Sequence, residues 1–191
     1  MKVLFVLLVT FHSINCANQN ENGEFPNLEF RYDESLLSLS QVFKEVSLSI
    51  PLGFNQVVGN DFSRIENNLE NIENSFFETD ILSSFQNKNG GVIIISQIKS
   101  ENPIIKKLDK EFESSLIQSS NVSDTNRGQF LLNGIETVQY ITKKGDIINY
   151  KLFFNVMHDK CYQIDYFVLL NNFVKFQSSM ESSISTLKIN N

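Results

Sequence analysis

The fold of this chain is decided by its last third, where residues 134–170 read GIETVQYITKKGDIINYKLFFNVMHDKCYQIDYFVLL. Apolar and aromatic residues are dense in three segments of this stretch, 134–142, 146–157 and 161–170, and that composition is typical of β-strands. The two linkers between the segments are only turn-length, so they cannot hold a crossover connection. We therefore predict three antiparallel strands that pair in chain order.

The segment before this meander predicts a strand and a helix. Apolar residues alternate with serines over 46–50, which indicates a half-buried strand, and Pro51 ends it because proline cannot donate to a ladder. Residues 35–45 fit a short helix and an irregular strand equally well. Further on, an amphipathic helix is predicted from apolar residues spaced three and four apart: Phe62, Ile65, Leu69, Ile72 and Phe76.

A hairpin and two further helices complete the pattern. Strands over 81–86 and 92–98 flank an Asn-Gly pair that suits a hairpin loop, and residues 119–129 are polar and read as a loop. A helix opens at Pro103 with one apolar face made by Ile104, Leu108, Phe112 and Leu116. A closing helix is spaced out by Phe173, Phe176, Met180 and Ile184, and residues 186–189 add a final short segment.

This order of elements resembles the PsbP-like family. The resemblance is carried by residues 46–54, by 134–140, and by 150–154 leading to 161–166; Phe54 stands where the family usually has a tryptophan. It implies a single α+β domain, an α/β/α sandwich in which helices flank an antiparallel sheet. It also implies an extracytoplasmic binding module that is seldom an enzyme, in a bacterial lipoprotein context.

The first sixteen residues indicate export. Lys2 precedes an apolar run that is too short to span a bilayer, which needs roughly 20 apolar residues, and residues 1–16 therefore read as a signal peptide. The segment ends in Cys16 in the manner of a lipobox, although Ser13 and Asn15 depart from the strict pattern. We favour lipidation of Cys16 as the membrane attachment; plain secretion after cleavage near Ala17 is the alternative.

Composition sets the remaining boundaries. Residues 17–30 are predicted to be a polar tether, and residues 31–191 a single globular domain. The formal net charge of −6 disfavours nucleic acid as a partner, because phosphate binding needs clustered lysine and arginine. The two cysteines, Cys16 and Cys161, leave no disulfide within the domain if Cys16 is lipidated or removed.

Four tyrosines are the candidate ligand-binding residues. They lie in the meander among phenylalanines, where aromatic side chains can line a ligand groove or a partner surface, although packing in the core is the commoner role. The four are Tyr140, Tyr150, Tyr162 and Tyr166.

Catalytic and metal chemistry have weak candidates. His158 is close to Cys161 and invites a thiol-dependent enzyme, but no orienting partner or nucleophile turn accompanies the pair. Glu66, Glu70 and Glu73 share a helix stripe, which reads as a solvated face rather than a calcium site. We expect no cofactor, no metal and no catalytic residue. The predicted function is a non-catalytic, lipid-anchored binding or accessory domain of the cell envelope, facing the periplasm or the exterior, with a possible protein partner there.

Overall fold

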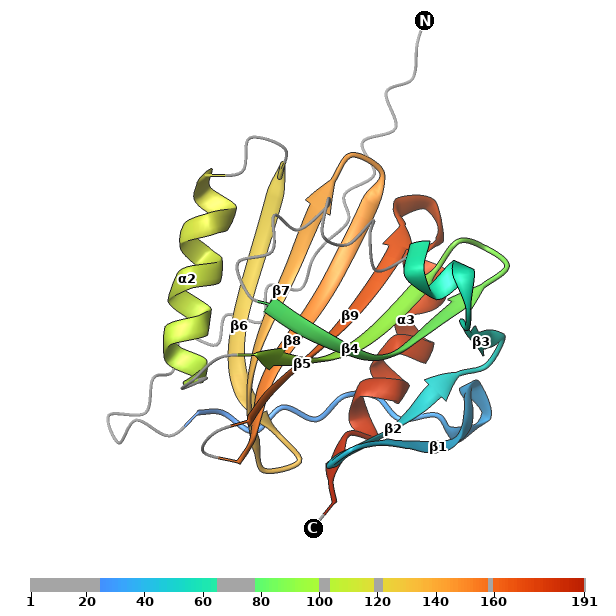
Figure 1. The fold of residues 1–191 in the computed structure, drawn as a ribbon, viewed down its shortest axis with the longest axis horizontal. Helices are drawn as coiled ribbons and strands as arrows, with labels where there is room; N and C mark the ends of the chain where they lie inside the picture. The colour runs from blue at the N-terminus through green and yellow to red at the C-terminus, as the bar shows by residue number, and fades with distance from the viewer. Residues whose placement is uncertain (1–24, 65–77, 100–103, 119–121, 158–159, 191) are drawn as a thin grey trace, which may run out of the picture.

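The strands predicted over residues 134–170 are present in the computed structural model, which describes residues 25–64, 78–99, 104–118, 122–157 and 160–190 (Figure 1). In chain order its elements are η1 (Glu34–Leu36), β1 (Leu37–Phe43), β2 (Val46–Pro51), β3 (Phe54–Gln56), β4 (Glu78–Asn87), β5 (Val92–Lys99), α2 (Ile105–Gln118), β6 (Asp124–Leu132), β7 (Ile135–Lys144), β8 (Ile147–Met157), β9 (Lys160–Leu169), α3 (Leu170–Ser185) and β10 (Lys188–Ile189).

The main sheet has the strand order β3-β4-β5-β9-β8-β7-β6, and its described pairs are all antiparallel. The loop predicted over 119–129 is wrong from Asp124 onward, because residues 124–132 form β6 and pair with β7 along their whole length. The sequence of β6 resembles a loop because β6 is an edge strand, and its first residues are polar and exposed. Hydrogen bonds to β7 hold the strand without an apolar face at that end.

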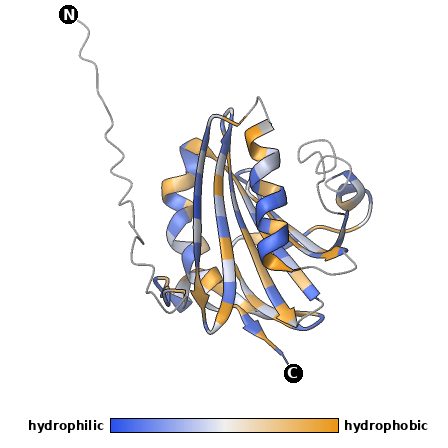
Figure 2. Cartoon of the chain, turned by 90° about the vertical axis from the view of Figure 1, so that its left-hand side faces the viewer, coloured by the Kyte–Doolittle hydropathy of each residue, from blue (hydrophilic) through white to orange (hydrophobic). Residues whose placement is uncertain are grey.

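Helices flank the main sheet on both faces, which confirms the predicted α+β sandwich (Figure 2). Helix α2 packs on one face through Leu108 and Phe112. On the other face lie α3 and the second sheet, β1-β2-β10, which enclose the larger core cluster between them. Both faces of the central strands are therefore buried, and β9 is covered along almost its whole length.

The second sheet refines two predictions. The strand predicted over 46–50 is confirmed as β2, but it is buried throughout rather than half-buried. The C-terminal segment covers its serines: Thr186 Oγ1 accepts from the Ser49 amide at 2.9 Å, and Ser47 Oγ donates to Asn190 Oδ1 at 3.2 Å. The ambiguous segment 35–45 resolves into the end of the short helix η1 followed by strand β1.

The hairpin and the helices were predicted with mixed success. Strands β4 and β5 confirm the hairpin, and Gly90 takes the positive φ of 81° that its turn requires. Residues 60–64 are helical, but the rest of the helix predicted over 62–76 lies outside the described residues. The apolar face of α2 starts at Ile105, which is buried, whereas Ile104 just before the helix is exposed.

The last residues of the segment predicted as a tether, 17–30, contact the folded domain. Pro26 and Leu28 bond to the β6 residue Leu131: the Leu131 amide donates to the Pro26 carbonyl at 2.9 Å, and the Leu28 amide donates to the Leu131 carbonyl at 3.0 Å. Leu28 and Phe30 also pack against the main core. The folded domain therefore includes these residues, because the apolar side chains of Leu28 and Phe30 pack against its core.

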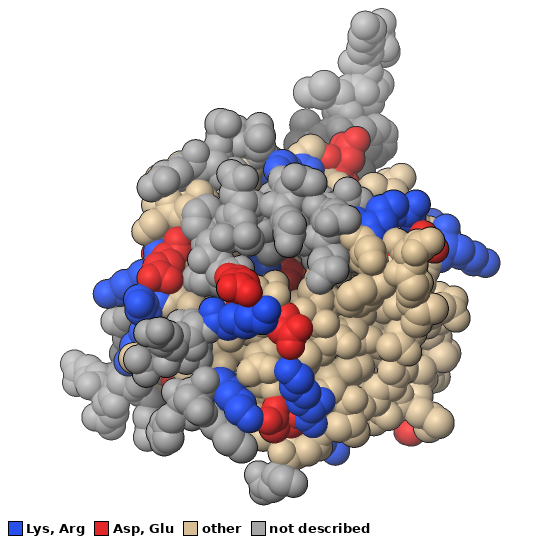
Figure 3. Space-filling view, viewed as in Figure 1, with Lys and Arg blue, Asp and Glu red and all other residues tan. Residues whose placement is uncertain are grey.

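Charged side chains are unevenly spread on the face shown in Figure 3. Lysine, arginine, aspartate and glutamate gather on the left of that view, over α2 and the adjoining ends of β4 and β5, whereas a broad area on the right, over β2 and β3, has few of them. Lys151 and Asp165 are instead buried inside the protein, where they form the ion pair described below.

Candidate functional site

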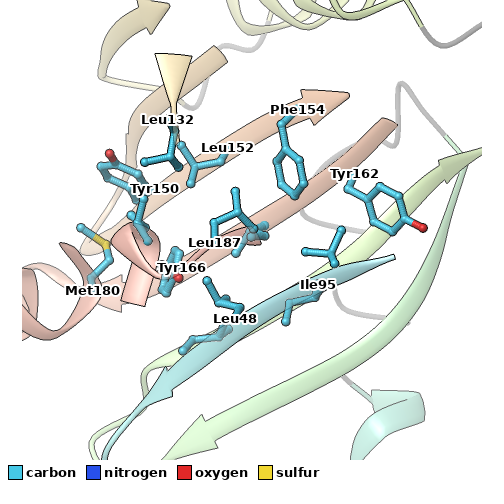
Figure 4. Close-up of a cluster of buried hydrophobic side chains, with 14 of the residues drawn as sticks. Leu48, Ile95, Leu132, Tyr150, Leu152, Phe154, Tyr162, Tyr166, Met180 and Leu187 are labelled. Atoms are coloured by element: carbon cyan, nitrogen blue, oxygen red, sulfur yellow. The ribbon is translucent and has the colours of Figure 1, made fainter. Parts of the chain in front are cut away.

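The four candidate tyrosines are buried and lie on opposite sides of the sheet. Tyr140 packs in the cluster under α2, and Tyr150, Tyr162 and Tyr166 belong to the core on the α3 side (Figure 4). The register of β7 and β8 separates them, because Tyr140 is the partner of Lys151, and the neighbouring residue Tyr150 points to the opposite face. The four side chains do not form one exposed surface; they pack in the core, which is the commoner role of such aromatic residues.

Every one of these tyrosine hydroxyls has a protein partner. Tyr140 donates to Asp109 Oδ1 at 2.6 Å, Tyr166 shares a 3.0 Å hydrogen bond with Ser183, and Tyr150 donates to Gln139. Burial raises the pKa of Tyr140 and Tyr166 above the ordinary tyrosine range, so both are neutral under physiological conditions. These contacts are those of side chains that order a core.

A polar cluster that the sequence did not predict joins the two sheets. Glu45, in the turn between β1 and β2, accepts from Lys160 Nζ at 2.5 Å and from the Tyr162 hydroxyl, both on β9. These hydrogen bonds, that of Lys160 first, lower the pKa of Glu45 to about 2. Sequence separation hid the cluster, because more than a hundred residues lie between the carboxylate and its partners.

A second cluster fastens α2 to the sheet. The Arg127 guanidinium on β6 binds the Asp109 carboxylate on α2 through both Nε, at 2.9 Å, and Nη2. Asp109 also accepts from Tyr140 on β7, so one helix residue ties two neighbouring strands. The pKa of Arg127 is raised, mainly by its hydrogen bond to Asp109. This bidentate geometry is the strong form of an ion pair.

Among the described residues the most buried charges are Lys151 on β8 and Asp165 on β9. Their side chains are 2% and 1% exposed, and Lys151 Nζ lies 2.7 Å from Asp165 Oδ1. Asn149 and Gln163 donate to the same carboxylate at 3.1 and 3.2 Å. Lys151 Nζ also lies 5.5 Å from the centre of the Phe112 ring, within cation–π range. Strand parity predicts that Lys151 shares a face with Phe153, but only the register of β8 and β9 shows that Asp165 lies opposite Lys151.

The candidate thiol is buried. Cys161 is a free cysteine with no exposed surface, and burial raises its pKa to about 12. At neutral pH it is therefore protonated, which is the unreactive form of a cysteine. Its predicted partner His158 lies outside the described residues, as do Cys16 and the stripe of Glu66, Glu70 and Glu73.

The described residues include neither a group of side chains suited to a metal ion nor a helix able to span a membrane. Among them no three histidine, cysteine or carboxylate side chains gather in a way that would hold a metal ion. None of the helices in this part of the chain combines the length and the apolar character needed to cross a bilayer.

One end of the main sheet presents an apolar surface. Its exposed side chains are Ile147, Leu169, Leu170 and Val174, which we call the apolar tip. Ile147 is paired with Leu169 across β8 and β9, and the Leu170 amide donates to the Asp146 carbonyl at 2.8 Å. The tip is therefore built on a hydrogen-bonded junction between the β7–β8 turn and the start of α3.

Lysines flank the apolar tip. Lys144 is the β7 partner of Ile147, and Lys175 follows Val174 on α3. The turn that holds Lys88 is joined to α3, because Asn172 Nδ2 donates to the Asn89 carbonyl at 3.3 Å. Exposed aliphatic groups beside cations form a chemically distinct surface on a chain whose formal net charge is −6.

Among known proteins, this chain shows similarity to solved structures. No family model matches it, and no curated protein matches it significantly. It is similar to the solution structure of cyanobacterial PsbP (CyanoP) from Synechocystis sp. PCC 6803, with a TM-score of 0.48 and 12% identity over 80% of this chain and 92% of that one. It is also similar to a crystal structure from Bacteroides thetaiotaomicron VPI-5482, with a TM-score of 0.44 and 12% identity over 77% of this chain, and it spans 46% of that chain. The first of these proteins carries the name of the family that the sequence resembles.

Proposed function

We propose that this chain is a non-catalytic, lipid-anchored binding or accessory domain of the cell envelope, held in the membrane by Cys16. The observation that carries the binding role is the apolar tip, an exposed aliphatic surface flanked by lysines. Protein interfaces have apolar centres and polar rims, so a protein surface with an acidic rim would fit the tip.

The burial of Cys161 supports a binding role over a thiol-dependent enzyme. A catalytic cysteine needs a thiolate and access to substrate, and Cys161 is fully buried with its pKa raised to about 12. The other charged residues examined above have partners within the protein: Asp109 binds Arg127, and Glu45 binds Lys160. These groups are therefore poorly placed for proton transfer to a substrate.

The geometry of the chain suits an anchor at one end and a binding surface at the other. Pro26, where the described chain begins to contact the sheet, lies beside Leu131, next to the β6–β7 turn. The apolar tip lies at the β7–β8 turn, at the far end of β7. Strand β7 runs from Ile135 to Lys144, a length of about 30 Å. An anchor that precedes Pro26 therefore leaves the tip free to meet a partner.

Metabolic labelling tests the anchor. The chain expressed in its own cell should incorporate palmitate and sediment with membranes, and Cys16→Ser should abolish both. A wild-type chain that takes up no label and stays in the soluble fraction would remove the anchor from the proposal.

Site-specific crosslinking tests the binding surface. A photo-crosslinking residue at Val174 should give a discrete adduct with one envelope protein, whereas Ile117, an exposed aliphatic residue on α2, provides the matched control. The adduct at Val174 should weaken when Lys144 and Lys175 are both replaced by glutamate. Equal adduct yields at both positions would contradict a specific surface at the tip. So would an adduct yield at Val174 that does not change when Lys144 and Lys175 are replaced by glutamate.

A further inference from the structure

Two asparagine–glycine pairs lie in turns that the structure describes. Asn89 and Gly90 are in the β4–β5 turn, and Asn133 and Gly134 are in the β6–β7 turn. The asparagine of such a pair can lose its side-chain amide, because the backbone nitrogen of the next residue can attack the asparagine Cγ, and glycine has no Cβ to block this approach. The contacts of each asparagine side chain decide which pair can react in the folded protein.

The Asn133 side chain is held by the C-terminal part of the domain. Its Nδ2 donates to the carbonyl oxygens of Ser185 and Leu187 at 3.0 and 2.9 Å, so it joins the β6–β7 turn to the end of α3. The reaction would remove this nitrogen as ammonia, and both hydrogen bonds would be lost with it. The folded state therefore protects Asn133.

The Asn89 side chain is exposed, and no hydrogen bond joins it to the described part of the chain. Its backbone is held instead, because the amide donates to Asn87 Oδ1 at 2.9 Å and the carbonyl accepts from Asn172 Nδ2 at 3.3 Å. The attacking nitrogen is the most weakly held in the turn. The Gly90 amide lies 3.2 Å from the Asn87 carbonyl, whereas the other hydrogen bonds of the turn are 2.8 to 3.0 Å long.

We infer that Asn89 is a deamidation site of the folded protein. In the first step the Gly90 nitrogen bonds to Asn89 Cγ, the bond from Cγ to Nδ2 breaks, and the proton of the Gly90 amide leaves with Nδ2 as ammonia. The product is a cyclic succinimide. Water then opens the ring at the side-chain carbonyl to give aspartate, or at the main-chain carbonyl to give isoaspartate. Both products carry a carboxylate where the asparagine was neutral.

The new carboxylate would lie beside the apolar tip, and its effect there rests on the proposed binding function. The β4–β5 turn touches the tip, since a Cβ built on Gly90 would lie 3.6 Å from Leu169 Cδ1. The hydrogen bond from Asn172 also joins Asn89 to the first turn of α3. A negative charge next to Lys88 offsets the positive flank of the tip, so a partner with an acidic rim would bind less tightly. Binding at the tip would therefore fall with the age of the molecule.

Peptide mapping by mass spectrometry tests the site in the purified full chain, incubated at mildly alkaline pH with and without urea. In the folded chain Asn89 should convert to aspartate and isoaspartate on the order of tenfold faster than Asn133, because two hydrogen bonds protect Asn133. In urea the two rates should become similar. Mapping separates both sites from Asn22, which also precedes a glycine. Equal rates in the folded chain would overturn the inference, as would an Asn89 that reacts only in urea.

A variant that imitates the product tests the effect on the tip. Asn89→Asp should lower the yield of the crosslinked adduct at Val174 by at least about twofold. Ser40→Asp adds the same charge to an exposed position of β1, in the second sheet, and should leave the yield unchanged. An unchanged yield in Asn89→Asp would overturn the effect on binding. If wild type gives no adduct at Val174, the proposed binding function fails, whereas peptide mapping still decides whether Asn89 is the deamidation site.

Discussion

Removal of one member of the buried pair Lys151–Asp165 should lower the free energy of unfolding far more than removal of both. Deleting one partner of a buried ion pair typically costs 3–5 kcal/mol, because the other charge remains without compensation. In Lys151→Met the Asp165 carboxylate keeps the donors Asn149 and Gln163, so we expect about 3 kcal/mol, the lower end of that range. In Asp165→Leu both amide donors and the ammonium lose their acceptor, so we expect about 5 kcal/mol.

The double variant Lys151→Met/Asp165→Leu is the decisive measurement. It buries no charge and leaves the two amide donors as its main defect, so it should cost no more than about 2 kcal/mol. Urea unfolding at pH 7, followed by circular dichroism, gives the free energy of unfolding of all variants. Lys107→Met is the control, since its ion pair with Glu111 is exposed and should be worth less than about 1 kcal/mol. If the double variant loses as much stability as the two single variants together, the reasoning is refuted.

Three further predictions concern single residues. Glu45→Gln should lower the free energy of unfolding by about 1–2 kcal/mol at pH 7. Because folding lowers the pKa of Glu45 from 4.5 to about 2, the difference in stability between this variant and wild type should vanish as the pH falls from 4.5 to 2. Thermal melts over this pH range measure the difference, and a constant difference would contradict the role of the Glu45 carboxylate. Cys161 should resist a thiol reagent at pH 8 until denaturant unfolds the Cys16→Ser chain, and rapid labelling of the folded protein would revive the thiol-enzyme alternative. Gly91→Ala should destabilise by about 1–3 kcal/mol in thermal melts, because the new Cβ would lie 2.9 Å from Asn87 Nδ2 and 3.0 Å from Phe54 Cζ; an unchanged Tm would show that these side chains give way freely.

Local sequence patterns predicted most elements of this fold. They failed for segments whose structure depends on pairing or contact with residues distant in the chain. The meander and the hairpin were readable because short turns leave antiparallel pairing as the only geometry. Strand β6 was missed because its polar edge residues resemble a loop, and its pairing with β7 is not written in its own sequence. The serines of β2 were expected to face solvent, but the C-terminal residues cover them.

The candidate site was harder to predict than the fold. Composition identified the tyrosines as notable, but only the structure shows that Tyr140 and Tyr150 lie on opposite faces of the sheet. The contacts of Glu45 with Lys160 join residues far apart in the chain, and no sequence period links them. The apolar tip arises where two turns and a helix start meet, so its residues are neighbours only in space.

The buried ion pair also explains how such an apolar meander keeps its register. Strands β8 and β9 are buried on both faces, so a slip by two residues would again place apolar groups on both sides and would meet little resistance from hydrophobic pattern alone. Lys151 and Asp165 are direct partners across these strands, so the same slip would separate their charges inside the core. The penalty for a buried, uncompensated charge is several kcal/mol, which is enough to select one register. We therefore expect the double variant Lys151→Met/Asp165→Leu to be stable yet less uniquely folded, with broadened amide resonances along β8 and β9. Sharp, single resonances in that variant would show that the apolar pattern sets the register without the charges.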